Sequence, residues 1–187
     1  MSAQALVQVR SWQAPRAKPP DIPTWLQTRA DLARALSRHP TDADLHEAMA
    51  YLYLLAAGRP DQGPLLSATY LRQALSHLRQ ATATRPMVPT AWANTALAIH
   101  QLAALEPTPE QSSRWLPALW AALERALVFG QRSQGVQQST GAVAFSRWTE
   151  LGPQRQQMVR NMVANATPAQ QRALRALASS HRVNLEP

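Results

Sequence analysis

The stretch that decides the fold is ALSHLRQATATRPMVPTAWANTALA, residues 74–98. Alanine and leucine recur every three or four residues on both sides of Pro86 and Pro89. This spacing places the apolar side chains along one helical face before and after the prolines. Because proline cannot continue a helix, the chain must reverse between the two segments. Small alanines let the helices approach closely, and larger side chains fill the space between them. The stretch therefore predicts paired helices over about 67–83 and 91–102.

The rest of the chain repeats this alternation of apolar helical blocks and breaking residues. Proline or glycine separates the blocks, and no segment shows the β-branched alternation of a strand. We therefore expect an all-α fold of about seven to eight helices. The expected helices run from Thr24 to before Pro40, from Asp42 to before Gly58, over 67–83, 91–102, 108–129, 136–148 and 152–165, and from Thr167 onward.

Local signals mark where these helices begin and end. Thr24 and Gln27 have the spacing of a capping box, and Asp42 offers a carboxylate to the start of the next helix. Pro117 should kink its helix or shift the start of that helix. Further start signals are Thr108 and Thr167, and a further stop signal is Gly130.

The residues around Pro86 resemble the tetratricopeptide pattern of small and large residues, a closing proline, and a second block that opens with alanine, an aromatic residue and asparagine. The residues that carry the resemblance are Ala74, Leu78, Ala81, Pro86, Ala91, Trp92, Asn94, Ala96 and Ala98. A weaker copy surrounds Pro40, at a separation longer than the ~34 residues of a standard repeat. An insertion over 59–66 can absorb the difference. The resemblance implies an antiparallel helix-hairpin (tetratricopeptide-like) solenoid. Its parts are an extended Pro-rich lead-in over 1–22, repeats over 23–130, and C-terminal helices over 131–187 that pack on the array.

The order of three longer segments also resembles the VpsP family of exopolysaccharide-biosynthesis accessory proteins. These segments are RADLARALSRHPTDADLHEAMAYLYLLAA (29–57), LRQATATRPMVPTAWANTALAIHQL (78–102) and ALERALVFG (122–130). The resemblance implies a helical-repeat protein in the periplasm, held at the inner membrane by an N-terminal helix. No apolar run here reaches the ~18–20 residues of a membrane-spanning helix. We therefore expect the anchor of the full-length protein to lie outside these residues, with a cytoplasmic location as the alternative.

The chain is basic, with a net charge of +8. Such a charge suits nucleic acid or another anionic polymer. However, Lys18 is the single lysine, and the arginines are dispersed over the expected helices without any run of like charge. This distribution favours the interpretation that the positive charge reflects a biased amino-acid composition and not a binding surface. Cysteine is absent, which excludes disulfides and cysteine metal sites.

The sequence does not show the motifs of the common enzyme classes. The five histidines never form a His-Glu-x-x-His pattern, and there is no glycine-rich phosphate loop. Asp42, Asp44 and Glu47 could suggest paired carboxylates, but their place at the start of a helix fits compensation of the helix dipole. We therefore expect no catalytic residues, no metal and no cofactor.

The tryptophans could be stacking platforms for sugars or bases, but their spacing favours core packing. Trp25, Trp92, Trp115 and Trp148 are expected in the core. Trp12 lies in the lead-in, where it could contact a partner, a membrane interface or the body of the protein.

If the repeat register is right, the first helix of each hairpin lines a concave groove. An asparagine there can hold an extended peptide backbone. The alternative is that the C-terminal helices fill the groove. The sequence therefore predicts a non-catalytic scaffold that binds a protein partner of a polysaccharide synthesis or export complex; the alternative is a basic helical domain that binds nucleic acid or another anionic polymer. The predicted partner-binding residues are Glu47, Tyr51, Leu54, Asn94, Leu97 and Gln101.

Overall fold

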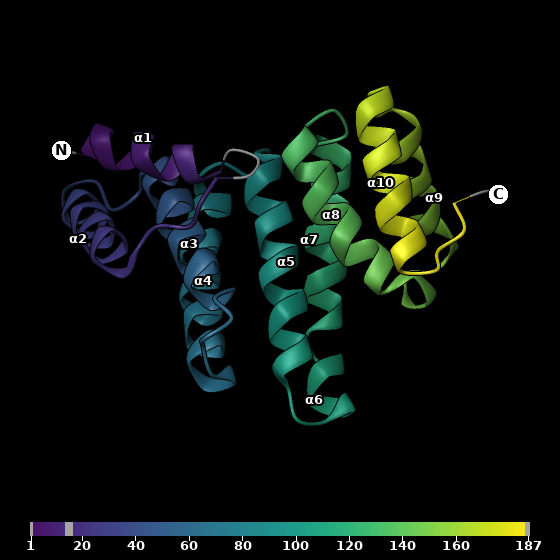
Figure 1. Ribbon diagram of the computed structural model, residues 1–187, viewed down its shortest axis with the longest axis horizontal. Helices are drawn as coiled ribbons and strands as arrows, with labels where there is room; N and C mark the ends of the chain where they lie inside the picture. The colour runs from purple at the N-terminus through teal and green to yellow at the C-terminus, as the bar shows by residue number, and fades with distance from the viewer. Residues whose placement is uncertain (1, 14–16, 186–187) are drawn as a thin grey trace. The chain divides into compact units, whose positions relative to one another are not determined.

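The computed structural model describes residues 2–13 and 17–185, and every regular element in those ranges is helical (Figure 1). The predicted all-α fold class is therefore confirmed. The chain divides into two compact units, and each is described by itself. Unit 1 comprises residues 1–86 with 104–106, and unit 2 comprises 87–103 with 107–187.

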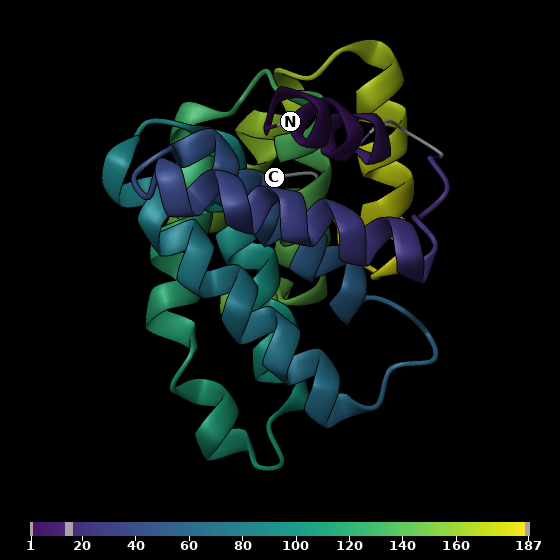
Figure 2. The ribbon, with the colours of Figure 1, turned by 90° about the vertical axis from the view of Figure 1, so that its left-hand side faces the viewer.

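Unit 1 contains α1 (Ser2–Trp12), α2 (Ile22–Arg38), α3 (Ala43–Ala57) and α4 (Pro64–Thr84). α3 and α4 form an antiparallel hairpin, because Arg85 after the end of α4 binds the start of α3, and Ser67 near the start of α4 binds the end of α3. α2 packs on α3, and α1 packs on both; α1 and α2 face the viewer in Figure 2. The core of the unit is apolar and includes Trp25, Leu32, Leu45, Met49 and Leu52.

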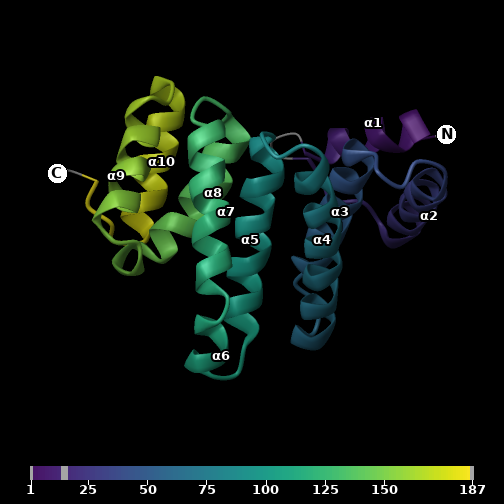
Figure 3. The same cartoon turned by 180° about the vertical axis from the view of Figure 1, so that it is seen from behind.

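Unit 2 contains α5 (Pro89–Leu105) up to residue 103, α6 (Pro109–Ser113), α7 (Leu116–Phe129), α8 (Gln134–Ser146), a 3-10 turn (Trp148–Glu150), α9 (Pro153–Ala164) and α10 (Pro168–Ser180). Ala93, Ala126 and Val136 join α5, α7 and α8 in one apolar cluster. α8 also packs on α9 and α10, and these helices lie together in Figure 3. Small residues at the contacts allow this close packing.

Most of the predicted start and stop signals are confirmed. Asp42 caps α3 through its carboxylate, which accepts hydrogen bonds from the backbone N–H groups of residues 44 and 45. Thr167 forms a full capping box with Gln170. Pro117 shifts the start of its helix: α7 begins at Leu116 with the proline in its first turn, and α6 is separate. Thr108 caps α6, and Gly130 ends α7.

Two predictions for the N-terminal region are wrong. The lead-in was expected to be extended, but Ser2–Trp12 is a helix, with Ala5 and Val9 buried in the core of unit 1. These two residues lie four apart, on one helical face. α2 begins at Ile22, capped by Asp21, instead of at a Thr24 cap. Proline is tolerated in the first turn of a helix, so Pro23 does not delay the start. Pro15 lies outside the described residues.

The units do not divide where the sequence placed its domain boundary. The expected boundary between repeats and C-terminal helices, at residue 130, lies inside unit 2, whereas the division in the structure follows Pro86. Among the helices of the described residues, none has the length and apolar character needed to cross a membrane.

Candidate functional site

The six predicted partner-binding residues are all half-buried. Glu47, Tyr51 and Leu54 follow one face of α3 in unit 1, as their spacing of four and three residues requires. The other three follow one face of α5 in unit 2 and are Asn94, Leu97 and Gln101. The structure therefore brings the predicted residues together as two sets of three, one in each unit.

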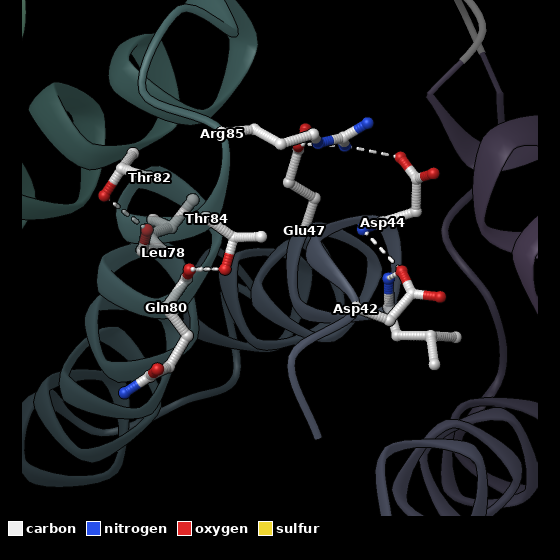
Figure 4. A network of polar contacts seen from close by, with 9 residues as sticks. Asp42, Asp44, Glu47, Leu78, Gln80, Thr82, Thr84 and Arg85 are labelled. Atoms are coloured by element: carbon white, nitrogen blue, oxygen red, sulfur yellow. Dashed lines mark hydrogen bonds and ion pairs between the residues drawn. The ribbon is translucent and has the colours of Figure 1, made fainter. Parts of the chain in front are cut away.

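Glu47 belongs to a polar network that joins the two ends of the α3–α4 hairpin (Figure 4). Arg85 Nη2 donates to Asp44 Oδ1 at 2.6 Å and to Glu47 Oε1 at 2.9 Å. Burial lowers the pKa of Arg85, but the hydrogen bonds and charges of the two carboxylates outweigh this, so its pKa is raised above the ordinary value. The Glu47 carboxylate therefore helps to hold the hairpin.

Tyr51 contacts the chain's own first helix. Its hydroxyl donates to the backbone oxygen of Trp12 at 2.9 Å, and burial raises its pKa. The indole of Trp12 packs, partly buried, against the core of unit 1. Of the three roles considered for Trp12, the structure shows contact with the body of the protein. α1 thus occupies the part of the predicted groove to which the Tyr51 hydroxyl points.

An aromatic cluster in unit 1 lies beside a cleft that the sequence did not predict. Trp25 is buried and donates its indole N–H to the Leu52 carbonyl at 2.9 Å. Tyr53 and Tyr70 meet its ring edge-on, with centroids 6.2 and 5.9 Å away. We call the adjoining space the aromatic cleft; its volume is about 130 Å³. It is lined by Pro19, Pro20, Ile22, Trp25, Leu26, Leu55, Ala56, Arg59, Gln62 and Tyr70.

The walls of the aromatic cleft are mostly apolar, with two polar side chains among them. Arg59 is half-buried and lies 3.4 Å from Asp61, a long contact for an ion pair. The side-chain oxygen of Gln62 is buried and accepts no hydrogen bond from the described residues. At the rim, Ile22 and Leu26 are 53 % and 45 % exposed. Exposed apolar side chains beside a concave, partly polar surface are typical of a binding site.

Two histidines extend the aromatic cluster along the hairpin. His77 stacks on Tyr53 with an interplanar angle of 16°, and its Nδ1 lies 2.9 Å from Nδ1 of His46. His46 Nε2 lies 2.8 Å from the Pro40 carbonyl, which can only accept, so this nitrogen carries the proton. One proton lies between the two Nδ1 atoms and joins the rings in a hydrogen bond. Burial, followed by the charge of His46, lowers the pKa of His77 to about 4.

A second histidine cluster lies in unit 2, near the end of α8. Arg147 Nε donates to His100 Nδ1 at 3.0 Å, so the other ring nitrogen carries the proton and faces the Ser146 hydroxyl at 3.4 Å. That hydroxyl donates to the Val143 carbonyl. A histidine that activates a nucleophile must accept the hydroxyl proton instead. Burial lowers the pKa of His100, followed in effect by the charge of Arg147.

The tryptophans divide into one core residue and several partly covered ones. Trp25 is in the core, as predicted, and Trp92 is half-buried and packs against the apolar cluster of α5, α7 and α8. Trp115 and Trp148 are also half-buried, so the prediction that they are core residues is wrong. Arginines cover several of the rings: the guanidinium of Arg125 lies 4.4 Å from the centroid of Trp92. Similar pairs are Arg29 with Trp25, Arg155 with Trp120 and Arg160 with Trp148. Part of the positive charge is therefore engaged in cation–π contacts with the protein's own tryptophans.

In residues 2–13 and 17–185, no three histidine, aspartate or glutamate side chains come close enough together to hold a metal ion. Comparison of the chain with models of protein families, with curated proteins and with solved structures gave no significant match.

Proposed function

We propose that this chain is a non-catalytic helical scaffold that binds an extended peptide segment of a protein partner at the aromatic cleft of unit 1. The observation that carries the proposal is the juxtaposition of prolyl and aromatic walls with a buried, unpaired amide oxygen. Pro19 and Pro20 form one wall, and Trp25 and Tyr70 contribute to the others. Aromatic-lined grooves suit extended, Pro-rich peptides.

The size and polarity of the cleft restrict the part of the partner that enters it. A cavity of ~150 Å³ can hold one benzene-sized group. A cleft of about 130 Å³ therefore has room for a single aliphatic or prolyl side chain. The neighbouring backbone N–H of an extended peptide can donate to the Gln62 oxygen. The exposed Ile22 and Leu26 side chains supply further apolar contact at the rim.

The tetratricopeptide-like solenoid is part of the proposal. It is supported by the antiparallel α3–α4 hairpin and by buried alanines at the helix contacts, among them Ala74 and Ala81. The predicted groove residues of α5, Asn94, Leu97 and Gln101, remain candidates for a second contact with the partner. On α3, the contacts of Glu47 and Tyr51 with other parts of the chain favour the aromatic cleft as the principal site.

We propose the biological setting from the resemblance described above: an accessory component of bacterial exopolysaccharide biosynthesis or export, periplasmic and anchored at the inner membrane in the full-length protein. The support for this setting is the three quoted segments.

The test compares the exposed cleft residue Leu26 with Val128, which is 56 % exposed on α7 in unit 2. Leu26→Arg should abolish co-purification of the partner with the tagged full chain, because it places a charge at the apolar rim. Val128→Arg should retain the partner. Circular dichroism confirms that both variants are folded. A partner that remains bound to Leu26→Arg would contradict the proposal.

The nucleic-acid alternative is distinguished by salt. A protein bound through an apolar cleft should stay bound between ~50 and ~200 mM salt, whereas binding through several phosphate contacts falls by orders of magnitude over that range. Fluorescence anisotropy of a labelled single-stranded oligonucleotide measures binding through phosphate contacts directly. Tight oligonucleotide binding that Leu26→Arg does not weaken would favour the anionic-polymer function.

A further inference from the structure

A second cleft lies in unit 2 between α8 and α10, and we call it the glutamine cleft. Its volume is about 340 Å³. One side presents glutamine side chains of α8, and the other is the largely apolar surface of α10. The lining residues are Gln134, Gln137, Gln138, Ala169, Gln170, Ala173, Leu174 and Leu177, and none of them is charged.

Gln137 is the unusual member of this lining, because it is a polar side chain with only 1 % of its surface exposed. Its Nε2 donates to the Gln131 carbonyl at 2.6 Å, which fixes the orientation of the amide. Its Oε1 is buried and accepts no hydrogen bond from the described residues. Buried amide oxygens almost always have a donor, so an unpaired one needs a specific explanation.

Two neighbouring polar groups, on α8 and α10, are engaged elsewhere. The Thr140 hydroxyl, one turn further along α8, donates to the Val136 carbonyl at 2.6 Å. The side-chain oxygen of Gln170 accepts from the backbone N–H of Thr167 in the capping box of α10. Leu174 of α10 closely approaches Gly141 of α8, which holds the two helices together. Neither polar group donates to Gln137 Oε1, so this oxygen is available to a donor that enters the cleft.

We infer that the glutamine cleft binds a small uncharged molecule that offers an N–H or O–H donor beside an apolar face. The donor pairs with Gln137 Oε1, and the apolar face packs on Leu174 and Leu177 of α10. A charged group would lose its hydration without gaining an opposite charge in this lining. The volume lies at the small end of the range for ligand pockets, ~300–1,000 Å³. This site is independent of the aromatic cleft in unit 1.

Benzamide and benzoate are matched probes of this chemistry, because they share a flat apolar ring. Benzamide brings N–H donors and no charge, whereas benzoate brings a negative charge and only acceptors. Titration of the ¹⁵N-labelled full chain should shift the Gln137 side-chain amide signals with benzamide. The affinity for benzoate should be at least about tenfold lower, since benzoate leaves the buried oxygen unpaired.

Variants of α10 show whether the probe occupies the cleft. Ala173 is exposed and lines the cleft, whereas Ala176 is exposed on the same helix and does not line it. Ala173→Trp fills the space and should weaken benzamide binding at least about tenfold; Ala176→Trp should leave it unchanged. Equal affinity for the two probes, or unchanged binding by Ala173→Trp, would overturn the inference. So would the absence of any shift up to the solubility limit of benzamide, in which case water pairs with the oxygen.

Discussion

The imidazole pair of unit 1 has a fixed proton arrangement that is sensitive to acid. His46 donates to the Pro40 carbonyl through Nε2, and its Nδ1 lies 2.9 Å from Nδ1 of His77, so a second positive charge on this close pair is unfavourable. The pKa of His77 falls from 6.5 to about 4 in the folded state, first through burial and then through the nearby charge of His46. The unfolded chain therefore binds a proton more readily than the folded chain between these values.

We expect the free energy of unfolding to fall as the pH decreases from about 6.5 to about 4, and this loss to be smaller in His77→Phe. Phenylalanine keeps the stack on Tyr53 but cannot titrate. The full pKa shift corresponds to about 3 kcal/mol, and solvent screening at this half-buried site reduces the expected difference to about 1–2 kcal/mol. Urea denaturation at pH ~7 and ~4.5 measures it. His39→Gln, at an exposed position, should retain the dependence of the unchanged chain; equal pH dependence in His77→Phe would contradict the assignment.

At the scale of helices, the junction of α5, α7 and α8 depends on Gly130, which ends α7. A Cβ atom added there would lie 2.5 Å from a methyl of Val136, 2.8 Å from the Ala126 carbonyl and 2.8 Å from the ring of Pro89. Two of these contacts involve backbone or a rigid ring, which cannot move independently. Glycine is therefore required for close packing at this point.

Gly130→Ala should destabilise the protein by about 1–3 kcal/mol, the usual effect of overpacking a core. Gly63→Ala is the matched control. Gly63 precedes α4, and a Cβ atom there would meet nothing within 4 Å, so the stability should change little. Thermal and urea denaturation of both variants measure the difference. Similar stabilities of the two variants would show that the junction relaxes without cost.

The helices that the sequence predicted are those bounded by local signals. Proline, glycine and capping residues act over three or four residues, so both limits of α3, the end of α7 and the start of α10 could be read from the chain. The first helix was not predicted because Pro15, Pro19 and Pro20 indicated an extended segment, although Ala5 and Val9 have helical spacing. The tetratricopeptide-like arrangement of the hairpins remains a prediction.

The two clefts could not be read from the sequence because each joins segments that are distant along the chain. The aromatic cleft brings Pro19 and Pro20 to Arg59 and Tyr70, which belong to a loop and to the following helix. The segment that contributes Gln137 is polar and glycine-interrupted, which weakened its helical pattern. Tyr51 was correctly placed on a helical face, but its hydrogen bond to Trp12 depends on the unpredicted first helix.

At the scale of the whole molecule, the presence of two compact units predicts that damage to one core stays local. Gly130→Ala should increase amide hydrogen exchange in α5, α7 and α8. Exchange in α2 and α3, whose core includes Trp25, Leu32 and Leu52, should remain unchanged. Hydrogen-exchange mass spectrometry of the full chain makes the comparison. A uniform increase over both units would show that they unfold as one cooperative body.

The buried indole of Trp25 also makes the chain optically informative. Its N–H is held by the Leu52 carbonyl, and two tyrosine rings flank it within about 6 Å. The side chain should therefore emit at short wavelength and receive excitation energy from both tyrosines. With the other five of the six tryptophans replaced by phenylalanine, loss of that energy transfer would report the moment at which α2 leaves α3.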